Sequence, residues 1–272
     1  MDCYCVFGNP IAHSKSPEIH AAYAAQTGQQ LSYERRLAPV DGFAQAVREF
    51  IAEGGKGANV TLPFKLDAHK VADALTMRAQ AAGAVNTLVF GPDGIIGDNT
   101  DGAGLVADIV RNAGVPIAGK RVLMLGAGGA ARGAVLPILE ERPAALVIAN
   151  RTLATAEALV EQFAALAGEG VLSSSGFESL QGSFDIVINA TSASLNAALP
   201  PIPAAVFHQG TLALDMMYGK EPTVFMHFAA EHGATVRDGL DMLIEQAAEA
   251  FYGWRGVRPD TSALLVQMRS KL

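Results

Sequence analysis

A polar loop near the start of the chain carries two closely spaced hydroxyl groups, on Ser14 and Ser16. Pro17 suits the first turn of a helix, so the loop is predicted to lead into a helix with Ser16 as its N-cap. Unpaired N–H groups at a helix N-terminus attract anions, and neighbouring hydroxyls can donate to a carboxylate. The loop is therefore a candidate cradle for a substrate carboxylate, the structural alternative being that Ser16 only caps the helix.

A second group of polar side chains accompanies an apolar strand predicted over Gly57–Leu62. Asn59 and Thr61 are two residues apart and are expected on one face of this strand. Lys65 follows just beyond the strand end, where a side chain can be directed into a cleft. This segment adds an amide, a hydroxyl and an ammonium group to the candidate site.

Two later turns supply an amide and a carboxylate, on Asn86 and Asp101. Amide, hydroxyl, ammonium and carboxylate groups with few aromatic residues are typical of a pocket for a small polyhydroxylated acid, although each residue alone could be ordinary turn chemistry. His13 and His20 flank the serine loop. His13 is expected to order that loop, and His20 is expected to lie on a helix face. No histidine, cysteine or carboxylate cluster has metal-ligand spacing, so no metal is expected.

A glycine cluster follows the apolar run Arg121–Leu125 and precedes a predicted helix. Its pattern is that of a dinucleotide-binding turn, in which small residues let a pyrophosphate approach free N–H groups at the helix start. The residues expected around the phosphates are Gly126, Ala127, Gly128, Gly129 and Ala130. The next strand, Ala145–Ala149, ends at Asn150, Arg151 and Thr152 rather than at an acidic residue. An arginine with neutral donors suits a 2′-phosphate, so NADP is predicted in preference to NAD.

The composition excludes several classes of protein. Of the 272 residues 50% are apolar and 17% charged, which is typical of a chain with a large buried core. The net charge of −7 and the lack of a basic run argue against nucleic acid as a partner. No secretory signal is visible, and the charge-free stretch Ile186–Leu214 contains prolines and amides unsuited to a membrane span. A cytoplasmic protein without disulfides is expected, with no membrane partner.

Short apolar runs alternate with longer alanine-rich helical runs, which predicts an α/β fold built from parallel βαβ units. Strands are predicted over Tyr4–Phe7, Ser32–Leu37, Gly57–Leu62, Thr87–Phe90, Arg121–Leu125, Ala145–Ala149, Ile186–Asn189 and Leu212–Asp215. Helices are predicted over Pro17–Thr27, Phe43–Glu53, Ala103–Ala113, Ala130–Glu141, Ala154–Leu166, Thr223–His232 and Met242–Trp254.

The chain resembles the shikimate dehydrogenases of the aromatic amino-acid pathway over nearly its whole length. The matching segments are, in family order, PIAHSKSP (10–17), NVTLPFK (59–65), GAVNTL (83–88), GDNTDG (97–102), GAGGAA (126–131), NRT (150–152), NATS (189–192) and GLDMLIEQAAEAF (239–251). Each piece is common elsewhere, but the combination is highly specific.

This resemblance implies two α/β domains with the active site in the cleft between them. Residues 1–101, completed by C-terminal helices 239–272, would form the substrate and catalytic domain, and residues 102–238 a Rossmann-type, doubly wound NADP-binding domain. The implied reaction is the reversible NADPH-dependent reduction of 3-dehydroshikimate to shikimate on the way to chorismate. A monomer or a homodimer is expected, with a small molecule as the ligand.

The resemblance also assigns roles to single residues. Ser14 and Ser16 would hold the substrate carboxylate, and Lys65, paired with Asp101, would be the acid/base. The remaining substrate contacts would be Asn59, Thr61, Asn86, Tyr218 and Gln246. Beyond the residues of the two turns, Thr155, Met216 and Gly239 would lie against the cofactor.

Three positions depart from the usual family pattern. Ala154 and Thr155 stand where many members carry a second basic residue, Ser194 stands where a glycine is common, and Met77 where a polar residue sometimes occurs. The nearest alternative is a quinate/shikimate dehydrogenase variant that uses NAD, against which Arg151 argues. The others are a non-catalytic ligand-binding protein on the same scaffold and a dehydrogenase for a folate or amino-acid substrate.

Overall fold

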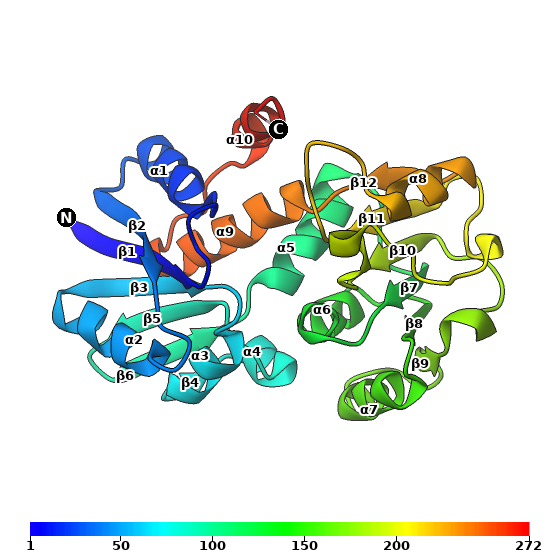
Figure 1. The fold of residues 1–272 in the computed structure, drawn as a ribbon, viewed down its shortest axis with the longest axis horizontal. Helices are drawn as coiled ribbons and strands as arrows, with labels where there is room; N and C mark the ends of the chain where they lie inside the picture. The colour runs from blue at the N-terminus through cyan, green and yellow to red at the C-terminus, as the bar shows by residue number, and fades with distance from the viewer. Residues whose placement is uncertain (272) are drawn as a thin grey trace. The chain divides into compact units, whose positions relative to one another are not determined.

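The computed structural model describes residues 1–271, apart from the side chains of residues 195 and 196. The chain divides into two compact units (Figure 1). The first unit contains Met1–Gly104 and Ile244–Lys271, and the second contains Leu105–Leu243. Both breaks fall within helices, α5 (Asp101–Ala107) and α9 (Leu240–Arg255). Each unit has a six-stranded sheet of its own.

The sheet of the first unit is mixed, with the strand order β2-β1-β3-β5-β6-β4. Its strands are β1 (Asp2–Gly8), β2 (Leu31–Leu37), β3 (Gly55–Val60), β4 (Ala74–Leu75), β5 (Thr87–Gly91) and β6 (Gly94–Asp98). The prediction of parallel units holds for β2-β1-β3 but is wrong for β5, which is antiparallel to both β3 and β6. Only a short turn joins β5 to β6, and strands joined so closely must run in opposite directions.

Helices from both ends of the chain surround this sheet. They are α1 (Ser16–Thr27), α2 (Phe43–Ala52), α3 (Lys65–Val71), α4 (Met77–Ala82), most of α9, and α10 (Ser262–Arg269). Figure 1 shows α9 and α10, in orange and red, beside the blue α1 and β1. The indole N–H of Trp254 donates to the Leu88 carbonyl at 3.0 Å, and the Tyr23 hydroxyl donates to the Ile244 carbonyl at 2.8 Å. The C-terminal helices are thus part of the first unit.

The sheet of the second unit is parallel throughout, with the order β12-β11-β10-β7-β8-β9. Its strands are β7 (Arg121–Leu125), β8 (Ala145–Ala149), β9 (Leu172–Ser175), β10 (Ile186–Asn189), β11 (Leu212–Asp215) and β12 (Thr235–Arg237). The chain builds outward from β7 to β9 and then returns to build outward from β10 to β12. This is the doubly wound topology, and its switch point lies between β7 and β10.

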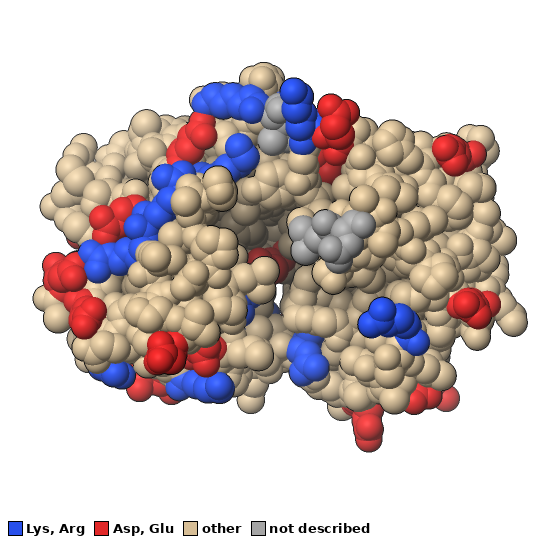
Figure 2. Space-filling model, viewed as in Figure 1, with Lys and Arg blue, Asp and Glu red and all other residues tan. Residues whose placement is uncertain are grey.

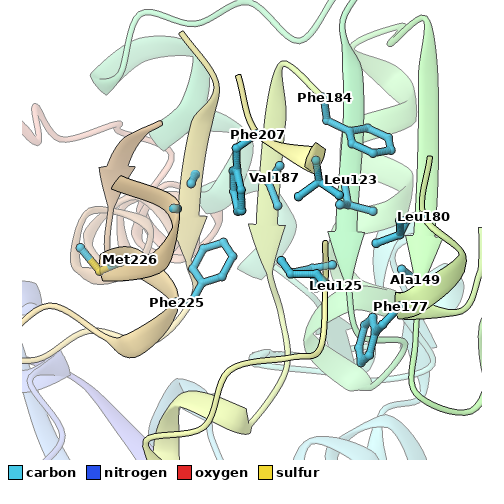
Figure 3. Packing of buried hydrophobic residues seen from close by; sticks show 14 residues of the cluster. Leu123, Leu125, Ala149, Phe177, Leu180, Phe184, Val187, Phe207, Phe225 and Met226 are labelled. Atoms are coloured by element: carbon cyan, nitrogen blue, oxygen red, sulfur yellow. The ribbon is translucent and has the colours of Figure 1, made fainter. Parts of the chain in front are cut away.

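The helices of the second unit are α6 (Gly129–Glu140), α7 (Leu153–Phe163) and α8 (Val224–Glu231), with a π-helical turn over Asp108–Asn112 after α5. One core cluster includes Leu123 and Leu125 of β7, Val187 of β10, and the rings of Phe184 and Phe225 (Figure 3). These side chains are almost completely buried, and their burial fixes β7 and the turn that follows it. Within the described residues no helix is both long and apolar enough to cross a membrane.

Candidate functional site

An ion pair between Lys65 and Asp101 lies at the centre of the polar cluster in the first unit. The Nζ atom of Lys65 is 2.6 Å from Oδ2 of Asp101, and the two side chains are 30% and 16% exposed. Lys65 begins α3, directly after the fully buried Phe64, whose ring stacks on Phe43 at 4.9 Å. This aromatic anchor fixes the start of α3 and with it the position of the lysine backbone.

Asp101 is held by the strand end that precedes it. Its backbone N–H donates to Oδ1 of Asn99 at 3.2 Å, while Nδ2 of Asn99 donates to the Ala84 carbonyl at 3.0 Å. Asp98, the last residue of β6, makes a bidentate ion pair with Arg78, with N···O distances of 2.7 and 2.6 Å. Burial alone would raise the pKa of Asp98, but the paired guanidinium keeps that pKa below its ordinary value.

Asn86 connects this carboxylate to helix α9. Its Nδ2 atom lies 2.8 Å from Oδ1 of Asp101 and 3.2 Å from Oε1 of Gln246. Its Oδ1 atom accepts from the Thr100 N–H at 2.9 Å, and the Thr100 hydroxyl lies 3.2 Å from Oε1 of Gln246. The structure therefore brings Lys65, Asn86, Asp101 and Gln246 together.

Asn59 and Thr61 lie in different environments, although their spacing predicts that they share one face of a strand. Asn59 is buried in β3 and bonds to Tyr33, His20 and Thr87, so protein groups occupy both of its polar atoms. Thr61 lies beyond the strand, which ends at Val60, and its N–H donates to the Phe7 carbonyl at 2.9 Å. Among the described residues its hydroxyl has no hydrogen-bond partner.

The serine loop differs from the predicted capping arrangement. Helix α1 begins at Ser16, so Lys15 is the N-cap and Pro17 the second helical residue. The prediction of Ser16 as N-cap is therefore wrong, because Ser16 is already the first residue of the helix. Instead Oγ of Ser14 accepts the Ser16 N–H at 3.3 Å, and the two hydroxyl oxygens are 3.2 Å apart. Ser16 is buried and Ser14 half-buried, with their hydroxyls paired.

The predicted dinucleotide turn lies in the second unit, between β7 and α6. Gly126 has a φ of +102°, and a Cβ there would lie 3.2 Å from the Ala190 carbonyl, so the turn requires glycine. Gly128 is the N-cap of α6, and a Cβ added at Gly128 or Gly129 would meet no atom within 4 Å. Open space thus faces the first N–H groups of a 12-residue helix, an arrangement that fits a pyrophosphate.

The turn after β8 presents the predicted 2′-phosphate residues. Asn150 uses its Nδ2 to donate to the Thr152 carbonyl at 2.9 Å, which closes the turn. Arg151 is exposed, and no carboxylate of residues 1–271 lies within ion-pair distance of it. Thr155 is exposed on the first turn of α7. A cation without a protein counter-ion at this strand end fits an adenosine 2′-phosphate.

The remaining predicted residues also belong to the second unit. A Cβ on Gly239 would lie 2.1 Å from the Met216 carbonyl oxygen, so Met216 and Gly239 form one close backbone contact. Burial raises the pKa of Tyr218, and Asp238 adds to this, so its hydroxyl stays a donor at neutral pH. Ser194, which departs from the family pattern, donates to Oδ2 of Asp215 at 2.6 Å.

Sequence reasoning missed Thr100, Tyr33 and Arg35. Thr100 lies inside the matching segment at 97–102, directly before Asp101, and that position was the only available signal. In the structure its hydroxyl accepts from Nδ2 of Asn86 at 3.0 Å. Tyr33 and Arg35 lie on β2, a strand with no motif. Tyr33 contacts Asn59, and Arg35 contacts Ser14 of the serine loop. Nothing in the local sequence indicated those contacts.

Comparisons with known proteins show the family to which the chain belongs. Three family models match the chain: the shikimate dehydrogenase substrate-binding domain at residues 6–88, shikimate/quinate 5-dehydrogenase at 108–199, and the shikimate 5′-dehydrogenase C-terminal domain at 239–265. A shikimate dehydrogenase (NADP(+)) from Janthinobacterium sp. (strain Marseille) is 63% identical over 271 residues, covering 100% of this chain and 98% of that protein. The corresponding protein of Herminiimonas arsenicoxydans is 62% identical, with the same coverage.

A solved structure shows the same fold. The crystal structure of shikimate 5-dehydrogenase from Thermus thermophilus, in complex with NADP(H) and shikimate, is 32% identical, with a TM-score of 0.88 and coverage of 100% of both chains. Identity above 60% over the full length, together with matches to the substrate-binding, central and C-terminal models, shows the family. The chain belongs to the shikimate dehydrogenase family.

Proposed function

We propose that this chain catalyses the reversible, NADPH-dependent reduction of 3-dehydroshikimate to shikimate on the path to chorismate. The observation that carries the proposal is the Lys65–Asp101 pair, set within the amide cluster of Asn86 and Gln246. The relatives named above are NADP(+) shikimate dehydrogenases. Lys65 and Asp101 lie in the segments at 59–65 and 97–102 that resemble this family.

The chemistry requires a hydride and a proton. When bound, the reduced nicotinamide supplies the hydride to the ketone carbon. The ammonium group of Lys65 hydrogen-bonds to the ketone oxygen, stabilises the alkoxide that forms, and donates the proton that completes the alcohol. Asp101 holds Lys65 in position through the 2.6 Å contact and balances its charge. In the reverse direction the same lysine takes the proton back.

The neighbouring groups suit the hydroxyls and the carboxylate of the substrate. Thr61 has a hydroxyl that no described residue engages, and Asn86 and Gln246 lie beside Asp101. The Ser14 and Ser16 hydroxyls, paired at 3.2 Å, would turn from each other to the carboxylate oxygens. Asn59 contributes by holding its neighbours, because protein groups already occupy its amide. We assign Tyr218 to a substrate hydroxyl because the family resemblance implies that role.

NADP is the cofactor that the second unit fits. Gly126, Ala127, Gly128, Gly129 and Ala130 form the turn that would hold the pyrophosphate. Asn150, Arg151, Thr152 and Thr155 would surround the adenosine ribose and its 2′-phosphate, and Met216 and Gly239 the nicotinamide end. Because the only charged group in the ribose set is cationic, the alternative of a quinate/shikimate enzyme that uses NAD is not favoured.

We place the enzyme in the cytoplasm, as a monomer or homodimer with a small-molecule substrate. Cys3 and Cys5 are both free thiols, which fits a reducing compartment. Figure 2 shows basic side chains flanked by acidic ones on the visible face, and the net charge is −7. These features do not favour nucleic acid as a partner.

The direct test mixes the protein with shikimate or quinate and with NADP or NAD, and follows the absorbance of reduced nicotinamide. The highest kcat/KM is expected for shikimate with NADP. Absence of reduction with shikimate and either cofactor would refute the proposed activity, and a higher kcat/KM with NAD would refute the cofactor assignment.

A further inference from the structure

Strand β2 contacts the serine loop and Asn59, although it carries none of the predicted site residues. Tyr33 and Arg35 are two residues apart and so point to the same side of the strand. Tyr33 donates to the side chain of Asn59, and Arg35 donates to the backbone carbonyl of Ser14. Ser14 therefore has a cationic partner on β2.

Arg35 holds the carbonyl oxygen of Ser14. Its Nε and Nη2 atoms donate to that oxygen at 2.9 and 2.5 Å. A carbonyl oxygen carries a partial negative charge, and one directed toward the hydroxyl pair would repel a bound carboxylate. The arginine keeps this oxygen engaged, and among residues 1–271 no carboxylate forms an ion pair with it. Its positive charge is therefore available to an anion on the serines.

Tyr33 ties β2 to neighbouring elements. Its hydroxyl donates to Oδ1 of Asn59 at 2.7 Å. The same Asn59 oxygen lies 3.1 Å from Nε2 of His20, and the Tyr33 and His20 rings stack at 4.3 Å with planes 9° apart. With its hydrogen committed and its ring stacked, Tyr33 fixes the strand that carries Arg35.

The same hydrogen bonds continue toward the proposed acid/base pair. Nδ2 of Asn59 donates to Oγ1 of Thr87 at 3.1 Å, and Thr87 donates to Oδ1 of Asn86 at 2.8 Å. Nδ2 of Asn86 in turn contacts Asp101 at 2.8 Å. The network thus runs from β2 to the carboxylate that pairs with Lys65, and it fixes β2 relative to that pair.

We propose that Arg35 is a positioning residue for the anionic end of the substrate: it engages the Ser14 carbonyl oxygen and adds positive charge beside the two serine hydroxyls. This inference rests on the proposed function, because it takes the anion to be the carboxylate of shikimate. It makes β2 a determinant of the preference for an acid over a neutral analogue.

The test compares Arg35→Gln with Arg36→Gln. Arg36, the next residue on β2, pairs with Glu34 and Glu53 instead and lies over the Phe50 ring. Arg35→Gln should raise the KM for shikimate about tenfold, less so at high salt, and should leave kcat/KM for shikimate methyl ester unchanged. Arg35→Lys should restore the salt dependence but only part of the affinity. Arg36→Gln should leave the KM for shikimate unchanged.

The two proposals fail in distinguishable ways. Wild-type protein that does not oxidise shikimate would refute the proposed function. Active wild type with an unchanged KM for shikimate in Arg35→Gln, or equal losses on shikimate and its methyl ester, would overturn only the assignment of Arg35. Because Arg35 is exposed, its replacement is not expected to disturb folding.

Discussion

The carboxylate of Asp101 is held from two sides, by Nζ of Lys65 at 2.6 Å on one oxygen and by Nδ2 of Asn86 at 2.8 Å on the other. Its backbone N–H is also engaged, by the side chain of Asn99. A carboxylate fixed in this way holds the Lys65 ammonium group in one position. Loss of the charge should therefore disturb the position of the proposed proton donor more than the binding of substrate.

We expect Asp101→Asn to lower kcat by roughly 10²-fold, at the lower end of the range for a lost acid/base group, because Lys65 remains but is no longer oriented or neutralised. The matched control is Asp67→Asn, which removes the carboxylate of an exposed pair with Lys70 at 3.2 Å. Steady-state kinetics with saturating NADP would measure both. A kcat in Asp101→Asn equal to that of the control would contradict a role for the pair.

The serine pair is expected to act on substrate affinity. Ser14→Ala and Ser16→Ala should each raise the KM for shikimate about tenfold, since a hydrogen bond to a charged group contributes ~1.5–3 kcal/mol. The KM for NADP should not change. The KM values come from shikimate titrations at saturating cofactor, and unchanged values in both variants would leave the loop with a structural role only.

Arg151 should decide between the two nicotinamide cofactors. Arg151→Ala is expected to cost ~1.5–3 kcal/mol of NADP binding and almost nothing for NAD, which would bring the two cofactors close to parity. Arg151→Lys should recover part of the preference, because it restores the charge without the paired donors. The measurement is kcat/KM for each cofactor with saturating shikimate. A full NADP preference in Arg151→Ala would refute this assignment.

His20 should make stability depend on pH. Complete burial lowers the pKa of this histidine to about 3, whereas in the unfolded chain it titrates near ~6.5. Between those values the unfolded chain binds a proton that the folded chain does not. The free energy of unfolding should therefore be highest above pH ~6.5 and decrease as the pH falls, by up to ~1.4 kcal/mol per pH unit from this group.

Asp108 acts in the opposite direction. Burial, only partly offset by Arg237, raises the pKa of its carboxyl to about 6, so its contribution to stability is present at low pH and lost as the pH rises through that value. Urea unfolding between about pH 4 and 7 should show a shallower pH slope in His20→Phe and a steeper one in Asp108→Asn. Identical slopes in His20→Phe and wild type would contradict the assignment to His20.

The sequence predicted the second unit better than the first. Strands β7 and β8 were predicted to the residue, because central parallel strands are buried on both faces and appear as continuous apolar runs. Strands β9 and β12 were missed, because they are short edge strands with serine, threonine and arginine. In the first unit the short helices α3 and α4 and the hairpin strand β6 carried too little periodicity to be detected.

The motifs indicated the candidate site residues but not what holds them. Asn59 was predicted as a substrate contact, whereas its position between Tyr33, His20 and Thr87 depends on three separate elements meeting in space. The N-cap assignment of Ser16 failed for a local reason: the helix begins one residue earlier than the position of proline suggested. Contacts between distant segments, unlike local turns, leave no periodic pattern in the sequence.

The measurement that tests the central claim most directly is kcat for shikimate oxidation by Lys65→Ala, beside wild type and Lys70→Ala. Lys70 lies on the same helix in an exposed pair with Asp67, so its loss changes the net charge equally. We predict that Lys65→Ala lowers kcat by roughly 10²–10⁴-fold, with a smaller change in substrate affinity, while Lys70→Ala matches wild type. A kcat close to wild type in Lys65→Ala would contradict the assignment of this lysine as the proton donor and acceptor.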